Sequence, residues 1–211
     1  MKKVTLLLVG ITTVFLVKGQ TVNIQAGTSF SKLDWSLTSV ETPKVFEESM
    51  IGYSFFAGID YLDKSYFNLS SNIGMIRKGG KGVTTLYDGI KISEKPTMDY
   101  LSLNTTIDFK YRIREKIAPF IGFGPRFDYL LNSSRHFDEL IRLDKFNDIS
   151  FGLIFGGGLK YDISDFRFGL RANYYLDFKN VAEWTGVDTG MGGKISVNVF
   201  TLNLSVGYRL K

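Results

Sequence analysis

Residues 166–178 read Phe-Arg-Phe-Gly-Leu-Arg-Ala-Asn-Tyr-Tyr-Leu-Asp-Phe, and this segment decides the fold. Every second side chain, from Phe166 to Phe178, is apolar, whereas the intervening positions are mostly polar, charged or glycine. This period of two is that of a β-strand, because successive side chains of a strand point to opposite faces. An amphipathic helix would instead show a period of about 3.6 residues.

The same alternation recurs along most of the chain. Leu101–Ile113 and Phe200–Leu210 repeat it cleanly, and five further segments repeat it with more noise: Val22–Phe30, Ile51–Leu62, Tyr66–Ile76, Ile117–Leu131 and Ile149–Ile163. A strand that crosses a membrane needs roughly 9–11 residues, which each segment approximately supplies. The sequence therefore predicts eight strands of membrane-spanning length.

Short and long connections alternate between these segments. The short ones are Asp63–Lys64, Arg114–Lys116 and Ser164–Asp165, and the long ones are Leu37–Met50, Lys78–Met98, Asn132–Asp148 and Lys179–Lys194. Outer-membrane barrels have short periplasmic turns and longer external loops. We therefore predict an all-β fold, an eight-stranded antiparallel up-and-down transmembrane β-barrel in the cell outer membrane.

The first nineteen residues have the organisation of a secretory signal peptide. Lys2 and Lys3 form a basic start, Val4–Val17 is apolar, and Val17-Lys18-Gly19 provides a cleavage region before Gln20. We predict a cleaved Sec-type signal at residues 1–19 and a barrel domain at residues 20–211. Loss of the three lysines lowers the formal net charge from +5 to +2, so an exported chain without a basic stripe is not expected to bind nucleic acid.

The composition restricts the chemistry available to the chain. It contains no cysteine and a single histidine, His136, which removes disulfides, thiolate metal sites and multi-histidine centres from consideration. No cofactor is predicted. The mean hydropathy of +0.01 resembles that of a soluble protein, but an alternating strand averages its lipid-facing and lumen-facing halves, so this value does not exclude a barrel.

The polar face of the strands carries charges of both signs and most of the strand glycines. In a membrane barrel this face points inward, and charges buried there need partners. We therefore expect a charge-paired network that fills the lumen, since eight strands leave room only for side chains. Its predicted members are Asp60, Asp108, Lys110, Arg112, Arg126, Asp128, Lys160, Asp162, Arg167, Arg171, Asp177 and Arg209.

Four tyrosines recur at nearly constant spacing. Tyr61, Tyr111, Tyr161 and Tyr208 lie 50, 50 and 47 residues apart, each close to a short turn or to the chain end. A common position on four hairpins places them at one height, which predicts a periplasmic aromatic girdle.

Several stretches resemble the PorT-like family of small, porin-like outer-membrane barrels. They are Ile73–Gly80, Tyr100–Arg112, Ile117–Pro125, the glycine-rich Phe151–Gly158 and Val206–Arg209. The resemblance implies an eight-stranded barrel in a Gram-negative-type envelope, and some members of that family are associated with type IX secretion. It implies no functional residues, because the family has no motif that fixes any.

We expect a non-enzymatic protein that acts as a structural, surface-interaction or secretion-accessory component through its external loops. The expected partners are outer-membrane lipid, the barrel assembly machinery during biogenesis, and a protein or glycan at those loops. Trp184, Val187 and Met191 could form part of such a contact. The alternatives are a narrow solute channel, a secreted lipocalin-like barrel and a lipid A-modifying or peptide-hydrolysing barrel enzyme, for which the third long loop offers Ser133, Ser134, His136, Asp138 and Glu139.

Overall fold

The computed structural model of the protein describes residues 20–37, 46, 48–85, 91–113, 116–185 and 192–210. The predicted signal peptide, residues 1–19, lies outside the described residues, as do Val187 and Met191 of the fourth predicted loop. These predictions therefore remain predictions.

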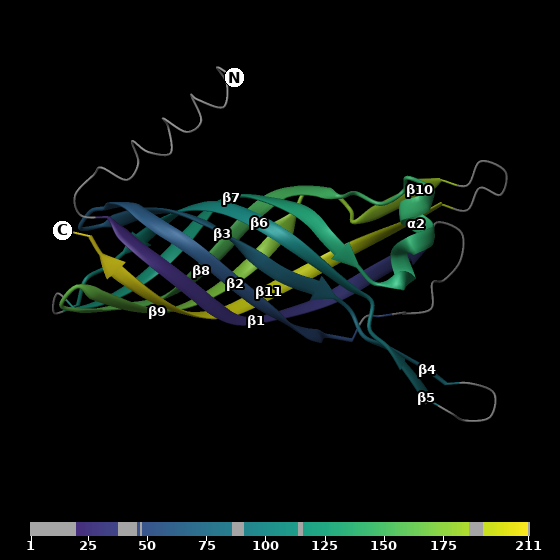
Figure 1. Ribbon diagram of the computed structural model, residues 1–211, viewed down its shortest axis with the longest axis horizontal. Coiled ribbons are helices and arrows are strands. Elements are labelled where there is room, and N and C mark those ends of the chain that lie inside the picture. Colours follow the sequence, from purple (N-terminus) through teal and green to yellow (C-terminus); the bar gives the residue numbers. More distant parts are fainter. Residues whose placement is uncertain are drawn as a thin grey trace, which may run out of the picture.

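Eight antiparallel strands form one closed sheet (Figure 1). β1 pairs with β11 from Thr21 opposite Arg209 to Leu37 opposite Gly193, and this ladder closes the barrel. The predicted fold class is thus confirmed. The barrel strands are β1 (Thr21–Leu37), β2 (Met50–Asp63), β3 (Phe67–Gly79), β6 (Thr97–Lys110), β7 (Ile117–Ser133), β8 (Ile149–Ile163), β9 (Phe166–Asp177) and β11 (Gly192–Arg209).

The remaining elements gather at one end of the barrel, opposite the short turns (Figure 1). Following the predicted orientation, we call this the external end and the end with the short turns the periplasmic end. β4 (Gly82–Thr85) and β5 (Lys91–Glu94) form a projecting hairpin, and β10 (Ala182–Thr185) adds to β11. A 3₁₀ turn, η1 (Arg135–Phe137), leads into the short helix α2 (Asp138–Arg142). No helix in the described part of the chain has the length and apolar character needed to cross a membrane.

The outer face of the barrel is apolar over most of its height. On β11, Leu202 and Leu204 face outward and are 42% and 67% exposed. The alternate residues Thr201 and Asn203 face inward and are almost fully buried. The other strands show the same arrangement, with phenylalanines, isoleucines and leucines facing outward. Such a surface suits hydrocarbon. A secreted lipocalin-like barrel would carry its apolar side chains inside and its polar side chains outside. That alternative is therefore wrong for the described strands.

The first and last strands exceed their predicted lengths the most. β1 continues seven residues beyond Phe30 to Leu37, and β11 begins eight residues before Phe200, at Gly192. In these extensions the polarity inverts: Leu33 and Ile195 face inward and are fully buried, while Lys32 and Lys194 are exposed. The prediction ended where the lipid-facing pattern ended, because a strand that meets water carries its polar side chains outward.

The predicted long loops contain packed structure as well as polar chain. Phe137 and Phe146 lie in the predicted Asn132–Asp148 loop, yet both are buried and their rings are 5.5 Å apart at an edge-to-face angle. They pack with Leu33 and Ile195 in one apolar cluster. We call the part of this cluster at the external end the external core. Its members are Leu33, Phe46, Met98, Phe137, Phe146, Val181, Ala182 and Ile195.

Inward-facing glycines let the luminal side chains lie close to the wall. A Cβ atom at Gly122 would collide with the carboxylate of Asp108, and one at Gly156 would collide with the side-chain oxygen of Asn173. At these two positions the space that the glycine leaves is therefore occupied by a polar side chain from the neighbouring strand. This close approach is what allows a narrow barrel to hold so many polar groups.

Candidate functional site

Charged side chains fill the lumen in two clusters. The external cluster consists of Lys78, Arg126, Asp128 and Asp177, from β3, β7 and β9. Lys78 Nζ lies 2.6 Å from Asp128 Oδ2 and 3.7 Å from Asp177 Oδ2, and Arg126 Nη1 donates to Asp128 Oδ2 at 2.5 Å. Arg126 also donates to Asp177. Two cations thus neutralise two carboxylates, which removes the cost of burying unpaired charge.

Aromatic rings complete the external cluster. Lys78 Nζ lies 4.7 Å from the centre of the Tyr100 ring, and the guanidinium of Arg126 lies 4.7 Å from the centre of the Tyr175 ring. Both tyrosines are buried, with 2% and 1% of their surface exposed. Cation–π contacts are strongest when they are desolvated, as they are at these positions.

The periplasmic cluster lies nearer the short turns and holds more charges. At its centre Arg167 donates from Nε to Asp162 Oδ1 at 2.7 Å, from Nη1 to Asp60 Oδ2 at 3.2 Å and from Nη2 to Asp63 Oδ2 at 2.8 Å. A guanidinium has five N–H donors in a fixed plane, so a single arginine can hold several carboxylates. The whole cluster is Asp60, Asp63, Asp108, Asp162, Lys110, Arg112, Lys160, Arg167, Arg171 and Arg209.

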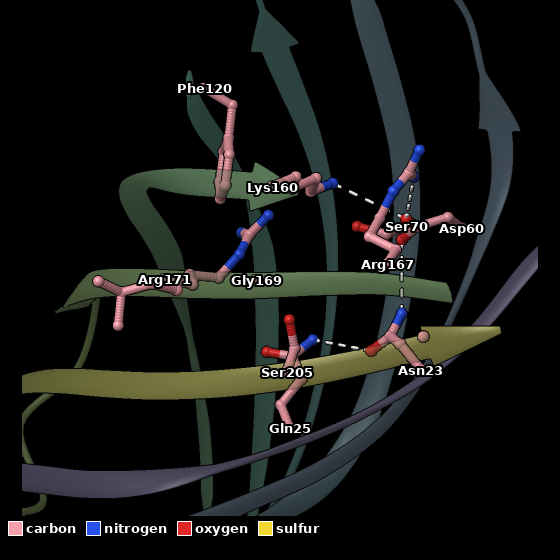
Figure 2. Close-up of a pocket in the computed structure, with 12 residues that line it drawn as sticks. Asn23, Gln25, Asp60, Ser70, Phe120, Lys160, Arg167, Gly169, Arg171 and Ser205 are labelled. Carbon is pink, nitrogen blue, oxygen red and sulfur yellow. Dashed lines mark hydrogen bonds and ion pairs between the residues drawn. The ribbon is translucent and has the colours of Figure 1, made fainter. Parts of the chain in front are cut away.

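Asp108 anchors the inner part of the periplasmic cluster. It is fully buried, accepts a hydrogen bond from Lys160 at 3.0 Å and accepts another from Arg171. Both cations also face the ring of Phe120, with centroid distances of 5.0 Å and 4.6 Å. Figure 2 shows this region, where Lys160 and Arg167 approach Asp60 from one side and Arg171 extends from β9 towards the middle of the lumen.

A layer of amides and hydroxyls separates the two clusters. Gln25 donates to Asn72 Oδ1 at 2.8 Å, and Asn72 donates to Asn104 Oδ1 at 3.0 Å. On another part of the wall, Ser54 donates to Asn203. These uncharged groups link β1, β2, β3, β6 and β11 across the middle of the barrel.

Very little empty space remains between the clusters. The cavity beside Asp60, Lys160, Arg167 and Arg171 measures about 30 Å³, and the one beside Asn72 and Asn104 measures about 10 Å³. A single water molecule needs roughly 10–15 Å³ of such space. These two cavities therefore have room for only a few waters.

The structure places each of the twelve predicted luminal charges in at least one ion pair. It divides them between two clusters, where the sequence suggested one network, and Arg112 and Arg209 lie at the partly exposed periplasmic margin. The sequence prediction omitted Lys78 and Asp63. Continuing the alternation of β3 from Asn72 through Ile76 would have assigned Lys78 to the lumen. Asp63 had no such signal, because a register shift between Asp60 and Leu62 changes the face on which it lies.

The four predicted girdle tyrosines all lie near the periplasmic end of their strands. Tyr111, Tyr161 and Tyr208 are 71%, 42% and 45% exposed on the outer face. Tyr208 packs edge-to-face on Phe166 at 5.4 Å. Tyr61 is only partly exposed, beside the register shift in β2.

Of the five loop residues considered for catalysis, the structure brings together Ser134 and His136 but no acid from that set. Ser134 Oγ lies 3.2 Å from His136 Nδ1, but the carboxylate on the other side of the ring is Glu94, at 3.7 Å from Nε2. Glu139 instead pairs with Arg142 at 3.5 Å. Asp138 is exposed in the first turn of α2, and Ser133 ends β7. Among the described residues, no group of three or more acidic or histidine side chains could hold a metal ion.

A closed sheet of eight long strands, an apolar outer surface and a lumen filled by ion pairs define an outer-membrane β-barrel. The comparison with protein families agrees: residues 18–183 match the family described as outer membrane protein beta-barrel domain. The chain belongs to this family. No curated protein matched the chain.

Solved structures of small outer-membrane proteins are similar in fold. OprG from Pseudomonas aeruginosa has a TM-score of 0.53 at 12% identity, with 91% of this chain and 97% of that chain covered. Neisserial surface protein A has a TM-score of 0.47 at 15% identity, with 92% and 100% covered. The N-terminal barrel domain of OprF from Pseudomonas aeruginosa has a TM-score of 0.45 at 11% identity, with 90% and 97% covered. At these identities the likeness concerns the fold alone.

Removal of the Asp108 carboxylate should destabilise the barrel strongly. Asp108→Ala leaves Lys160 and Arg171 buried without their shared partner, which should lower the free energy of unfolding by about 3–5 kcal/mol. The measurement is denaturant unfolding in phosphatidylcholine vesicles, followed by tryptophan fluorescence. Glu139→Ala is the control, because its exposed ion pair with Arg142 should contribute no more than about 0.5 kcal/mol. Equal losses for the two variants would contradict this account of the lumen.

Proposed function

We propose that this protein is a closed outer-membrane barrel whose external end serves as a surface for interaction. The observation that carries the proposal is the filled lumen. Two ion clusters and an amide layer occupy the lumen of the described strands, and the two cavities beside them measure only about 30 Å³ and 10 Å³. A scaffold closed in this way is suited to presenting its loops rather than to passing solutes through its centre.

The external end has the properties of a presentation platform. The external core holds η1, α2 and β10 against the ends of the barrel strands, through Phe137, Phe146, Val181 and Ala182. Above it, Ile141 and Leu143 are exposed, and Trp184 is partly exposed beside Leu140. Residues held by a rigid scaffold recognise partners at a low entropic cost, because they are already ordered.

The resemblance to PorT-like barrels supports a role as an accessory of secretion, of the type IX kind, as one form of this function. In that form the partner at the external end would be a component or a cargo of the secretion apparatus. A glycan is the other class of partner that we consider, and the assembly machinery would recognise the chain only during biogenesis. The proposal includes export by the predicted signal peptide and no enzymatic activity.

The closed lumen predicts an electrically silent protein. Purified protein reconstituted in a planar lipid bilayer should give no unitary current steps, because buried ion pairs occupy the path that hydrated ions would take. Folding of the inserted protein is checked by its heat-modifiable mobility on a gel. Regular steps whose size increases with salt concentration would identify a channel and overturn the proposal.

The orientation of the barrel predicts which sites trypsin reaches on intact cells. Arg142 and Lys145 are exposed at the external end, whereas Lys64 and Lys116 are exposed at the opposite end. Trypsin added to intact cells should cut after Arg142 or Lys145 and spare Lys64 and Lys116 until the outer membrane is permeabilised. Mass spectrometry of the released peptides measures this, and the opposite order of cleavage would show that the platform faces the periplasm.

A further inference from the structure

The wall of the barrel is interrupted between β9 and β11. Their ladder ends at Tyr175 opposite Val199, although β9 continues its pairing with β8 as far as Asp177. β11 also continues, paired with β1 as far as Gly193. From Ile195 back to Gly192, β10 replaces β9 as the second neighbour of β11, and the Val181 N–H donates a hydrogen bond to the Ile195 carbonyl. Residues 176–180 and 196–198 therefore face each other across a gap.

This gap opens into a groove of about 660 Å³, which we call the lateral groove. One side is the end of β9 with residues 178–180, the other is residues 196–198 of β11, and the segment 144–147 after α2 completes it. Small-molecule sites typically have volumes of about 300–1,000 Å³. The lateral groove is thus far larger than either luminal cavity and is large enough for a sugar-sized ligand.

The lateral groove lies at the external margin of the apolar outer surface. Tyr174, Leu176 and Phe178 lie along its β9 side with 43%, 43% and 63% of their surface exposed, as expected of side chains that face lipid. The next residues, Lys179 and Asn180, are polar. With the external end at the cell surface, this is the height at which the headgroups of outer-leaflet lipids lie.

The groove offers both hydrogen-bond donors and hydrogen-bond acceptors. Lys145 and Lys179 supply positive charge, and Asp144 and Glu183 supply negative charge. Neither lysine forms an ion pair with any described residue. Asp177 also lines the groove, but its carboxylate is already paired with Lys78 and Arg126 in the lumen. Because the charges balance, the groove does not select a simple anion. It suits instead a hydroxyl-rich ligand such as a saccharide, whose every hydroxyl group both donates and accepts hydrogen bonds.

Hydrogen bonds among the lining residues fix their positions. The Tyr174 hydroxyl donates to Asn198 Oδ1 at 3.1 Å across the gap, and Asn147 Nδ2 donates to the Asn180 carbonyl at 2.8 Å. Asn180 Nδ2 donates to Glu183 Oε2 at 3.3 Å. These bonds join the three sides of the groove, so its polar groups are ordered before any ligand arrives, which reduces the entropic cost of binding.

From this placement and chemistry we propose that the lateral groove binds the saccharide headgroup of a glycolipid in the outer leaflet. Its amides, carboxylates and lysines would bond to sugar hydroxyls, while the exposed rings of Tyr174 and Phe178 offer apolar faces to sugar C–H groups. The acyl chains would lie against the outward-facing residues of β9. The proposal rests on the proposed function, because it requires the external end to face the outer leaflet.

A second hollow adjoins the lateral groove at Lys145, which lines both. It measures about 480 Å³, and Trp35, Trp184, Leu140 and Leu143 contribute to its lining. Aromatic and aliphatic side chains here would extend the binding surface towards the external end. A headgroup of several sugars could therefore continue from the groove into this hollow.

The test measures glycolipid retained by the folded barrel. Full-length protein in phosphatidylcholine nanodiscs that contain rough lipopolysaccharide, which carries a short core saccharide, is transferred to detergent, and bound lipid is counted by native mass spectrometry. We expect one retained lipopolysaccharide per barrel. Ser196→Trp, which fills the groove, and Lys179→Ala, which removes a donor, should each lower retention at least tenfold. Ser65→Trp, in an exposed turn at the opposite end, is the matched control and should retain lipid like the parent protein.

Three results would overturn the proposal. The first is undiminished retention by both groove variants, with folding verified by heat-modifiable mobility. The second is equal retention of phosphatidylethanolamine, which lacks a saccharide, and the third is equal binding of core oligosaccharide freed of its lipid. If the barrel gives no current and has the predicted orientation but fails this lipid test, the proposed function still stands. A conducting barrel whose retention still depends on Ser196 and Lys179 would refute the proposed function and leave the groove assignment standing.

Discussion

The pairing of β1 with β11 is the contact on which the rest of the structure depends. It joins the first strand to the last along 17 residue pairs and so closes the eight-stranded sheet on itself. Closure at eight strands fixes an interior that side chains alone can fill. Each inward-facing charge must then find a partner inside this space, which is why Asp108, Asp128 and Lys78 are buried almost completely and yet are all paired.

Whether the outer surface of the closed sheet meets lipid or water decides which side chains face outward. Along the membrane-facing part, leucine and phenylalanine point out and asparagine, serine and arginine point in. Towards the external end of β1 and β11 the order reverses, so that the outside becomes polar and the inside becomes the external core. The same strands therefore pass from a membrane barrel to an arrangement typical of a soluble protein. The lateral groove lies where these two regimes meet and β9 separates from β11.

Period-two alternation made most of the fold and most of the luminal cluster members predictable. Each strand in the membrane repeats apolar-out and polar-in, so Arg126, Lys160 and Arg171 could be assigned to the lumen from position alone. The sequence offered less where that physical rule ends. The extensions of β1 and β11 follow the reverse polarity, and Asp63 faces inward because of a register shift. The lateral groove depends on where two strands stop pairing, which no local pattern in either strand records.

A site-directed spin-label scan along β11 tests the central claim most directly. The chain has no cysteine, so single cysteines can carry the label in vesicles, and collisions with oxygen and with a water-soluble nickel complex can be compared. We predict high oxygen accessibility at Leu202 and Leu204, low accessibility to both reagents at Thr201 and Asn203, and high nickel accessibility at Lys194. Nickel accessibility at Leu202 and Leu204 that equals the value at Lys194 would contradict the account, because the apolar face would then lie in water.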